Sequence, residues 1–202
     1  PEDGFVFCCF NNNYKISPDV FALWMRLLTR VPGSVLWLLA APPEAMQALR
    51  GEAVEHGIAA ERLVFAERAP LAEHLARHAR ADLFLDTFHC NAHTTASDAL
   101  WAGLPVLTRL GRAFPGRVAA SLLTAAGLPE LIAADAAEYE ALAVAFAEDP
   151  VRLAGLRQRL AAQKGACALF DCERYTRKLE AAFEAMWRRH AADEAPAHLD
   201  IV

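Results

Sequence analysis

A run of polar residues suited to holding an anion follows an apolar segment in the middle of the chain. The segment 82–86 reads Asp-Leu-Phe-Leu-Asp, and the loop after it ends in His93, Thr94 and Thr95. We expect a helix to open at Thr94 or Thr95, where free backbone N–H groups point outward and attract anions. The two hydroxyls can add hydrogen bonds to phosphate oxygens. The pattern therefore favours a phosphate site at this helix tip.

Asp98 lies one helical turn beyond Thr94, on the same face of the expected helix. Its carboxylate can accept hydrogen bonds from ribose hydroxyls if the phosphates of a nucleotide lie at the tip. The plainer alternative is an N-capping Thr94 with an exposed Asp98. That alternative leaves unexplained why His93 and Thr95 gather at the same place.

Two further polar groups follow other apolar runs. The segment 11–15, Asn-Asn-Asn-Tyr-Lys, offers amide donors and one ammonium suited to phosphate. A polar loop with an exposed Lys15 is the alternative that these residues leave open. His74 lies early on a later helix, where an imidazole can stack on a base, and Arg77 shares its face. An ordinary amphipathic helix with exposed His74 and Arg77 fits that spacing equally well.

Motifs of several other site types are absent from the sequence. There is no Asp-x-Asp to hold a metal–diphosphate, and His89, Cys90 and His93 lack a second ligand pair with zinc spacing, so we expect no metal. No G-x-G-x-x-G follows the first apolar run, which weakens a dehydrogenase interpretation. Any diphosphate must then be neutralised by Lys15, the helix tip and an arginine, Arg117. An ordinary surface arginine is an equally good interpretation of Arg117.

Six short apolar runs alternate with helical patterns and must position these residues. The runs are continuous rather than alternating, as in strands covered on both faces; they span 5–10, 34–39, 63–65, 82–86, 105–108 and, weakly, 131–133. Helices are expected over 19–31, 44–56, 71–80, 94–102 and 118–126. This alternation predicts an α/β fold with a doubly wound, parallel, Rossmann-like sheet and right-handed crossovers. Ligands bind such sheets beyond the carboxyl ends of the strands, where the polar groups stand.

Three more helices are expected after Ala134, over 136–148, 150–164 and 172–192. The last carries Tyr175, Leu179, Phe183 and Trp187 at four-residue steps, an apolar stripe that either closes this domain or crosses to a partner lobe. We therefore expect one domain over residues 1–192 and a flexible tail over 193–202.

Composition narrows the class of protein further. A length of 202 residues with 55% hydrophobic residues suits one domain with a sizeable core, and a net charge of −5 argues against a general nucleic-acid binder. No apolar run approaches the ~20 residues that span a bilayer, and no signal peptide is evident. Five cysteines without a CxxC pair favour a reducing compartment, so we expect a cytoplasmic protein. A strand begins at Phe5 with almost no lead-in, which we interpret as a cut inside a longer chain.

With these residues in view, the chain closely resembles the C-terminal catalytic lobe of the O-linked N-acetylglucosamine transferase and SPINDLY-like glycosyltransferases, and looks like a bacterial homologue. The resemblance covers about residues 5–190, and its motifs are highly specific as a set. The matching stretches are FNNNYKI (10–16), RVPGSVLWLL (30–39), AP (69–70), EH (73–74), LDT (85–87), CNAHTT (90–95), DALWAGLPV (98–106) and RVAAS (117–121).

The resemblance implies the C-terminal lobe of a GT-B fold, and inverting transfer of N-acetylglucosamine from UDP-N-acetylglucosamine to protein Ser or Thr without metal or cofactor. It also implies the roles of nine donor-binding residues. Asn12, Lys15, Thr94 and Thr95 contact the diphosphate, His93 lies beside it, His74 packs on uracil with Ala69 and Arg77 near the base, and Asp98 binds ribose. Lys15 is expected to make the largest catalytic contribution.

Two positions depart from the family pattern. Asn12 stands where the family usually has Gln, and Leu71 stands where the animal enzymes have Lys, so one ribose or phosphate contact is missing. The resemblance further implies an N-terminal GT-B lobe, upstream helical TPR repeats and protein acceptors as partners, with the catalytic base outside this chain. Two alternatives stay open: a sugar-nucleotide epimerase lobe, and a repeat-associated scaffold that has lost catalysis.

Overall fold

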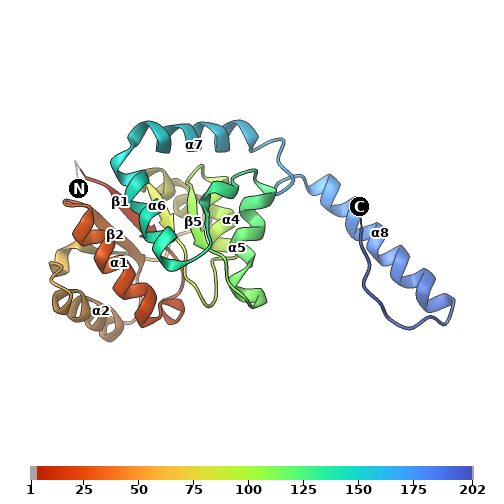
Figure 1. Ribbon diagram of the computed structural model, residues 1–202, viewed down its shortest axis with the longest axis horizontal. Helices are drawn as coiled ribbons and strands as arrows, with labels where there is room; N and C mark the ends of the chain where they lie inside the picture. The colour runs from red at the N-terminus through yellow and green to blue at the C-terminus, as the bar shows by residue number, and fades with distance from the viewer. Residues whose placement is uncertain (1–3, 202) are drawn as a thin grey trace.

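A six-stranded parallel sheet forms the centre of the computed structural model, which describes residues 4–201 (Figure 1). The strands are β1 (Val6–Cys9), β2 (Val35–Leu39), β3 (Leu63–Ala66), β4 (Leu83–Leu85), β5 (Val106–Arg109) and β6 (Ile132–Ala133). Each strand boundary lies within one residue of an expected run. The predicted parallel α/β sheet is therefore confirmed, its weak sixth strand included.

The order of the strands, β3-β2-β1-β4-β5-β6, places β1 beside both β2 and β4. Phe7 of β1 pairs with Leu36 on one side and with Leu83 on the other. The chain first winds outward from β1 to β3, then returns to β4 and winds the other way. Such a switch point opens a crevice at the carboxyl ends of the two central strands, and ligands of α/β sheets bind there.

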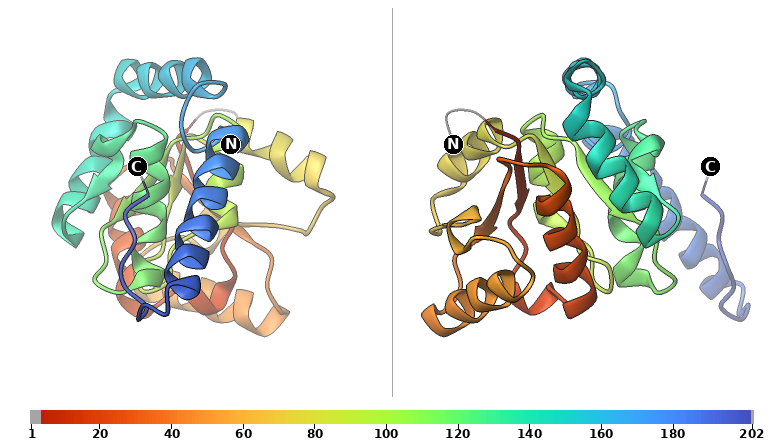
Figure 2. Two further views of the ribbon diagram at one scale, coloured as in Figure 1. Left: turned by 90° about the vertical axis from the view of Figure 1, so that its right-hand side faces the viewer. Right: turned by 60° about the vertical axis from the view of Figure 1, so that its left-hand side comes forward.

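Helices cover both faces of the sheet (Figure 2). The α-helices that the structure describes are α1 (Pro18–Arg30), α2 (Pro43–Glu55), α3 (Leu71–Arg77), α4 (Thr94–Trp101), α5 (Val118–Ala125), α6 (Ala136–Glu148), α7 (Pro150–Gln163) and α8 (Cys172–Ala191), of which α8 lies apart from the sheet. Right-handed crossovers place α1 and α2 on one face and α3, α4 and α5 on the other. The helix α6 returns to pack beside α1, where Arg26 forms an ion pair of 2.9 Å with Glu140.

The helix α1 shows how the apolar pattern fixes a helix against the sheet. Pro18 occupies its first turn, and Trp24, Leu27 and Leu28 are buried on its inner face. Ser17 precedes α1 as its N-cap residue and makes no side-chain capping bond; its hydroxyl donates to the carboxylate of Asp19.

The ends of the helices follow the glycines of the sequence. Gly57, Gly103 and Gly127 stop their helices with φ of 76°, 86° and 71°, in the left-handed region that glycine adopts without strain. One helix is shorter than expected, because α3 ends at Arg77 and a 3-10 turn covers 78–80. That turn tucks the side chain of His78 into the core.

The last helix, α8, projects away from the sheet and its covering helices (Figures 1 and 2). Its apolar stripe faces solvent: Tyr175, Leu179, Phe183 and Trp187 are 66%, 39%, 58% and 68% exposed. The expectation that α8 closes this domain is therefore wrong, because its apolar stripe is left exposed within residues 4–201. Beyond it, residues 193–201 form no helix or strand. No described helix combines the length and apolar character that crossing a membrane requires.

Candidate nucleotide-diphosphate site

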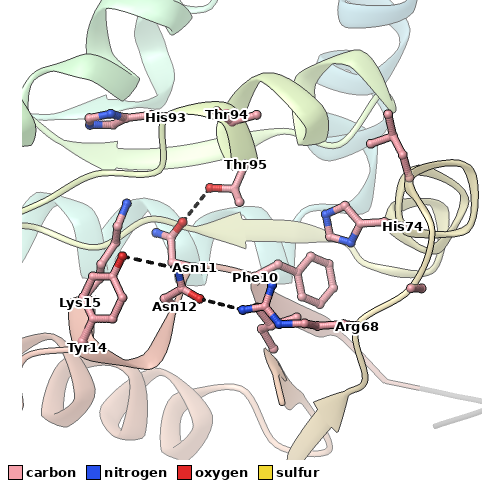
Figure 3. Close-up of a pocket in the computed structure, with 13 residues that line it drawn as sticks. Phe10, Asn11, Asn12, Tyr14, Lys15, Arg68, His74, His93, Thr94 and Thr95 are labelled. Carbon is pink, nitrogen blue, oxygen red and sulfur yellow. Dashed lines mark hydrogen bonds between the residues drawn. The ribbon is translucent and has the colours of Figure 1, made fainter. Parts of the chain in front are cut away.

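A pocket of about 460 Å³ opens where the segments after β1, β3 and β4 meet at the carboxyl edge of the sheet (Figure 3). Its volume lies within the range of about 300–1,000 Å³ that is typical of small-ligand sites. Seven of the nine predicted donor-binding residues line it: Asn12, Lys15, Ala69, His74, His93, Thr94 and Thr95. The structure thus brings together residues separated by 83 positions in sequence (95 − 12).

The other two predicted residues lie outside the lining of this pocket. Arg77 donates from Nη1 to the carbonyl of Glu67 at 2.8 Å. Asp98 is half-buried one turn into α4. Their roles toward base and ribose stay predictions. Arg117 also lies outside the pocket, exposed, with Nη1 donating to the carbonyl of Gly111 at 3.0 Å.

Lys15 joins the two loops that flank the switch point. A 3-10 turn over Asn13–Lys15 follows β1, closed by a hydrogen bond of 3.0 Å from the backbone N–H of Lys15 to the carbonyl of Asn12. The Nζ atom of Lys15 donates to the carbonyl of Asn91, in the loop after β4, at 2.8 Å. An ammonium carries three N–H groups, so two are left for a ligand.

The tip of α4 forms the opposite wall of the pocket. The helix begins at Thr94, and its N-cap residue His93 makes no side-chain capping bond, so the first backbone N–H groups are available to an anion. The hydroxyl of Thr95 donates to Oδ1 of Asn11 at 2.6 Å. Its hydrogen is therefore committed, and the backbone N–H of Thr95 is the group that can reach a phosphate.

A buried carboxylate, Asp86, holds the loop that carries this helix tip. Its Oδ1 accepts from the backbone N–H groups of Thr87 at 2.8 Å and Ala92 at 2.6 Å. Its Oδ2 accepts from the hydroxyl of Thr108 on β5 at 2.7 Å. Asp86 is fully buried, so these bonds are shielded from water. The carboxylate therefore fixes both ends of the loop 87–92.

Two buried asparagines extend this network to the pocket. Asn11 donates to the hydroxyl of Thr87 at 2.9 Å, in addition to accepting from Thr95. Asn91 donates to the carbonyl of Thr87 at 2.7 Å and accepts from the backbone N–H of Ala119 at 3.3 Å. The donors that face the pocket are thus held before any ligand arrives, which is the condition for strong electrostatic stabilisation.

Burial shifts the pKa of two groups at the site. It raises the pKa of Asp86 from its ordinary value of 3.8 to about 7, against the lowering effect of the bonds from Thr108, Ala92 and Thr87. It lowers the pKa of His74, and Arg77 lowers it further. A neutral His74 is therefore favoured near pH 7, and a neutral imidazole can stack on a base.

The charge of the pocket opposes the charge of the whole chain. The lining residues include two cations, Lys15 and Arg68, and no Asp or Glu among the residues described, although the net charge is −5. Arg68 was not predicted; its Nη2 donates to Oδ1 of Asn12 at 3.3 Å (Figure 3). The local excess of positive charge favours an anionic ligand.

The side chains that commonly bind metal ions are dispersed in the part of the chain that the structure describes. Within residues 4–201, no three His, Cys, Asp or Glu side chains gather closely enough to hold a metal ion. His89, Cys90 and His93, which the sequence brings close together, do not form such a group. The five cysteines are unpaired.

The sequence contains signals for the residues that we did not predict. Asp86 is a carboxylate directly after the apolar strand β4, and a charge at that point indicates a buried partner network or a site. Arg68 stands two residues after β3, at the carboxyl edge of the sheet. Asn11 differs from Asn12 and Asn13, which are half-buried, only in being fully buried, and the sequence does not reveal that burial.

A Rossmann-like parallel sheet with a polar pocket at its switch point has the lobe architecture of GT-B glycosyltransferases. The chain belongs to glycosyl transferase family 41, whose model matches residues 1–179. It is 38% identical to a probable UDP-N-acetylglucosamine–peptide N-acetylglucosaminyltransferase, SEC, of Arabidopsis thaliana over all of this chain and 21% of that protein. It is also 38% identical to the Caenorhabditis elegans UDP-N-acetylglucosamine–peptide N-acetylglucosaminyltransferase, over 98% of this chain and 17% of that protein.

Solved structures show the same lobe. A mutant O-GlcNAc transferase of Thermobaculum terrenum superimposes with a TM-score of 0.88 and 35% identity, over 92% of this chain and 36% of that one. The Anabaena protein HepE, solved with UDP and glucose, shares the fold alone, with a TM-score of 0.62, 15% identity and coverage of 88% and 48%. Compared with the curated relatives from Arabidopsis thaliana and Caenorhabditis elegans, the chain spans about a fifth of their length.

Proposed function

We propose that this chain is the nucleotide-holding C-terminal lobe of a glycosyltransferase that transfers N-acetylglucosamine from UDP-N-acetylglucosamine to Ser or Thr of proteins, with inversion. The observation that carries the proposal is the convergence of Lys15 and the α4 tip on one pocket at the switch point. The relatives from Arabidopsis thaliana and Caenorhabditis elegans are named as UDP-N-acetylglucosamine–peptide N-acetylglucosaminyltransferases, which supports this donor and a peptide acceptor.

In this proposal the lobe stabilises the charge that grows on the departing diphosphate. The acceptor oxygen forms a bond to the anomeric carbon while the bond from that carbon to the β-phosphate oxygen breaks, and its electron pair leaves with UDP. Lys15 and the first backbone N–H groups of α4 face the β-phosphate, whose oxygen leaves the anomeric carbon. Removal of one comparable preorganised donor costs about 3–4 kcal/mol of transition-state stabilisation. Because Asn91 already holds the Lys15 ammonium, little reorganisation is needed as the charge develops.

In this proposal the uridine half lies beside His74, on the right in Figure 3, and Ala69 lines the same pocket. The ring of His74 packs edge-on against Phe10, with 5.5 Å between centroids, which fixes its plane. Its lowered pKa favours the neutral form, which stacks on uracil without a desolvated charge. Metal-independent neutralisation of the diphosphate by protein cations and the helix tip is part of the proposal.

The acceptor side of the reaction belongs to other parts of the protein. We assign the catalytic base, the acceptor contacts and part of the sugar pocket to an N-terminal lobe and to helical repeats. The exposed stripe on α8 supports a missing partner surface, because such a stripe on a helix is normally covered. The chain alone should therefore bind UDP and show almost no transfer.

Binding of UDP tests this proposal directly. UDP at about 100 times its dissociation constant should stabilise the chain by about 2.7 kcal/mol, measured as a rise in Tm, and ADP should give a smaller rise. Lys15→Ala should bind UDP weakly while its own Tm stays near that of the wild type. An absence of any UDP-dependent shift would instead indicate the scaffold alternative.

A further inference from the structure

A second cation stands in the pocket wall, on the segment between β3 and α3. Arg68 lines the pocket, and Figure 3 shows its guanidinium pointing toward Asn12, between the Lys15 side and the His74 side. The hydrogen bond of 3.3 Å from Nη2 to Oδ1 of Asn12 links the segment after β3 to the loop after β1. The side chain is thus directed along the pocket, toward the loop that carries Lys15.

The guanidinium of Arg68 keeps most of its hydrogen-bonding capacity. It has five N–H donors in a planar fork, and the bond to Asn12 uses one. Across residues 4–201, no carboxylate lies within ion-pair distance of it. An unpaired fork on a pocket wall without acidic residues is suited to bidentate binding of phosphate oxygens.

The charge balance of a bound diphosphate argues for a second cation. A nucleoside diphosphate carries about three negative charges near neutral pH, since its terminal phosphate alone carries about 1.5–2. Lys15 supplies one positive charge, and the α4 tip supplies about half of one. Leu71, three residues after Arg68 and lining the same pocket, is apolar and 65% exposed, so it adds none.

We infer that Arg68 is the second cationic ligand of the nucleotide diphosphate, opposite Lys15, and that it fills the electrostatic role left open by Leu71. This inference rests on the proposed function, because it needs UDP as the ligand. It assigns Arg68 to the phosphates rather than to the base, since its fork reaches toward Asn12 and Lys15.

Calorimetric titration of the full chain with UDP and with uridine distinguishes contact of Arg68 with the phosphates from contact with the base. Loss of a charge-assisted contact corresponds to about 10- to 100-fold weaker binding. Arg68→Ala should therefore weaken UDP by that factor and leave uridine within about twofold. Adding Leu71→Lys to Arg68→Ala places an ammonium on the same wall and should recover much of the UDP affinity.

Arg80→Ala is the matched control, because Arg80 is an exposed arginine of the 3-10 turn after α3 and does not line this pocket. It should bind UDP as the wild type does. The inference is overturned if Arg68→Ala binds UDP like the wild type, or if uridine weakens by the same factor as UDP. A wild-type chain that binds no UDP would contradict the proposed function itself, which distinguishes the two failures.

Discussion

The buried carboxylate of Asp86 should make the stability of this protein depend on pH in an unusual direction. Burial raises its folded-state pKa from 3.8 to about 7. Between about pH 4 and pH 7 the folded chain therefore holds a proton that the unfolded chain has lost. The stabilising contribution is fully present below about pH 4 and is lost as pH rises to about 7. At about 1.4 kcal/mol per pH unit, the full difference is on the order of 4 kcal/mol.

Asp86→Asn removes this titration with little change of shape. The amide oxygen can still accept from the backbone N–H groups of Thr87 and Ala92, and the amide nitrogen can donate to the hydroxyl of Thr108. The cost at low pH should be about 1 kcal/mol, the size of a typical hydrogen bond. Asp86→Ala leaves several buried donors without an acceptor and should cost about 3–5 kcal/mol at pH 4. That cost should shrink as pH rises toward 8, because the wild type alone loses the contribution of the buried proton.

Urea unfolding at pH 5 and at pH 8 measures the effect as a difference between wild type and Asp86→Asn. Between the two pH values the free energy of unfolding of the wild type should fall by several kcal/mol relative to that of the variant, so the variant should be the more stable protein at pH 8. Comparison at each pH cancels the histidines, which both proteins share. A difference that stays constant from pH 5 to pH 8 would refute the assignment of a raised pKa to Asp86.

Two more changes probe the fold and the unpartnered helix. Gly103→Ala should lower the free energy of unfolding, measured in urea, by about 1–2 kcal/mol, because φ is 86° at this position even though open space surrounds a new Cβ. Gly51→Ala, inside α2, should raise it by up to about 1 kcal/mol. Equal effects of the two substitutions would contradict the backbone explanation. Phe183→Ser with Trp187→Ser should reduce concentration-dependent self-association in sedimentation velocity while leaving Tm unchanged, since both side chains are exposed on α8. A large fall in Tm would show that the stripe packs within the domain.

The elements of the fold could be predicted because each carries a local signal. Continuous apolar runs mark the six strands, and glycines such as Gly57 and Gly103 mark helix ends. The order of the strands could not be predicted, since it depends on which strands pair across the whole chain. The switch point between β1 and β4 therefore came only from the structure, although it explains why Lys15 and Thr94 meet.

The residues of the site also divide into those that the sequence predicts and those that it does not. The types and positions of Lys15, His74 and Thr94 suit a nucleotide site but leave plainer alternatives open, and the family resemblance is what favours the site. The positioning network was not predicted, because the burial of Asn11 and Asp86 arises from loops that are distant in sequence. Arg68 lies outside the family motif, which marks Leu71 as the position that departs, and only the structure shows that this cation three residues earlier lines the same pocket.

A crystal structure of the chain with UDP is the most direct test of the central claim. The diphosphate should lie within hydrogen-bonding distance of the Lys15 ammonium and of the backbone N–H of Thr95, with uracil against His74. A nucleotide bound at any other part of the molecule, with Lys15 and the α4 tip in contact only with water, would contradict the claim.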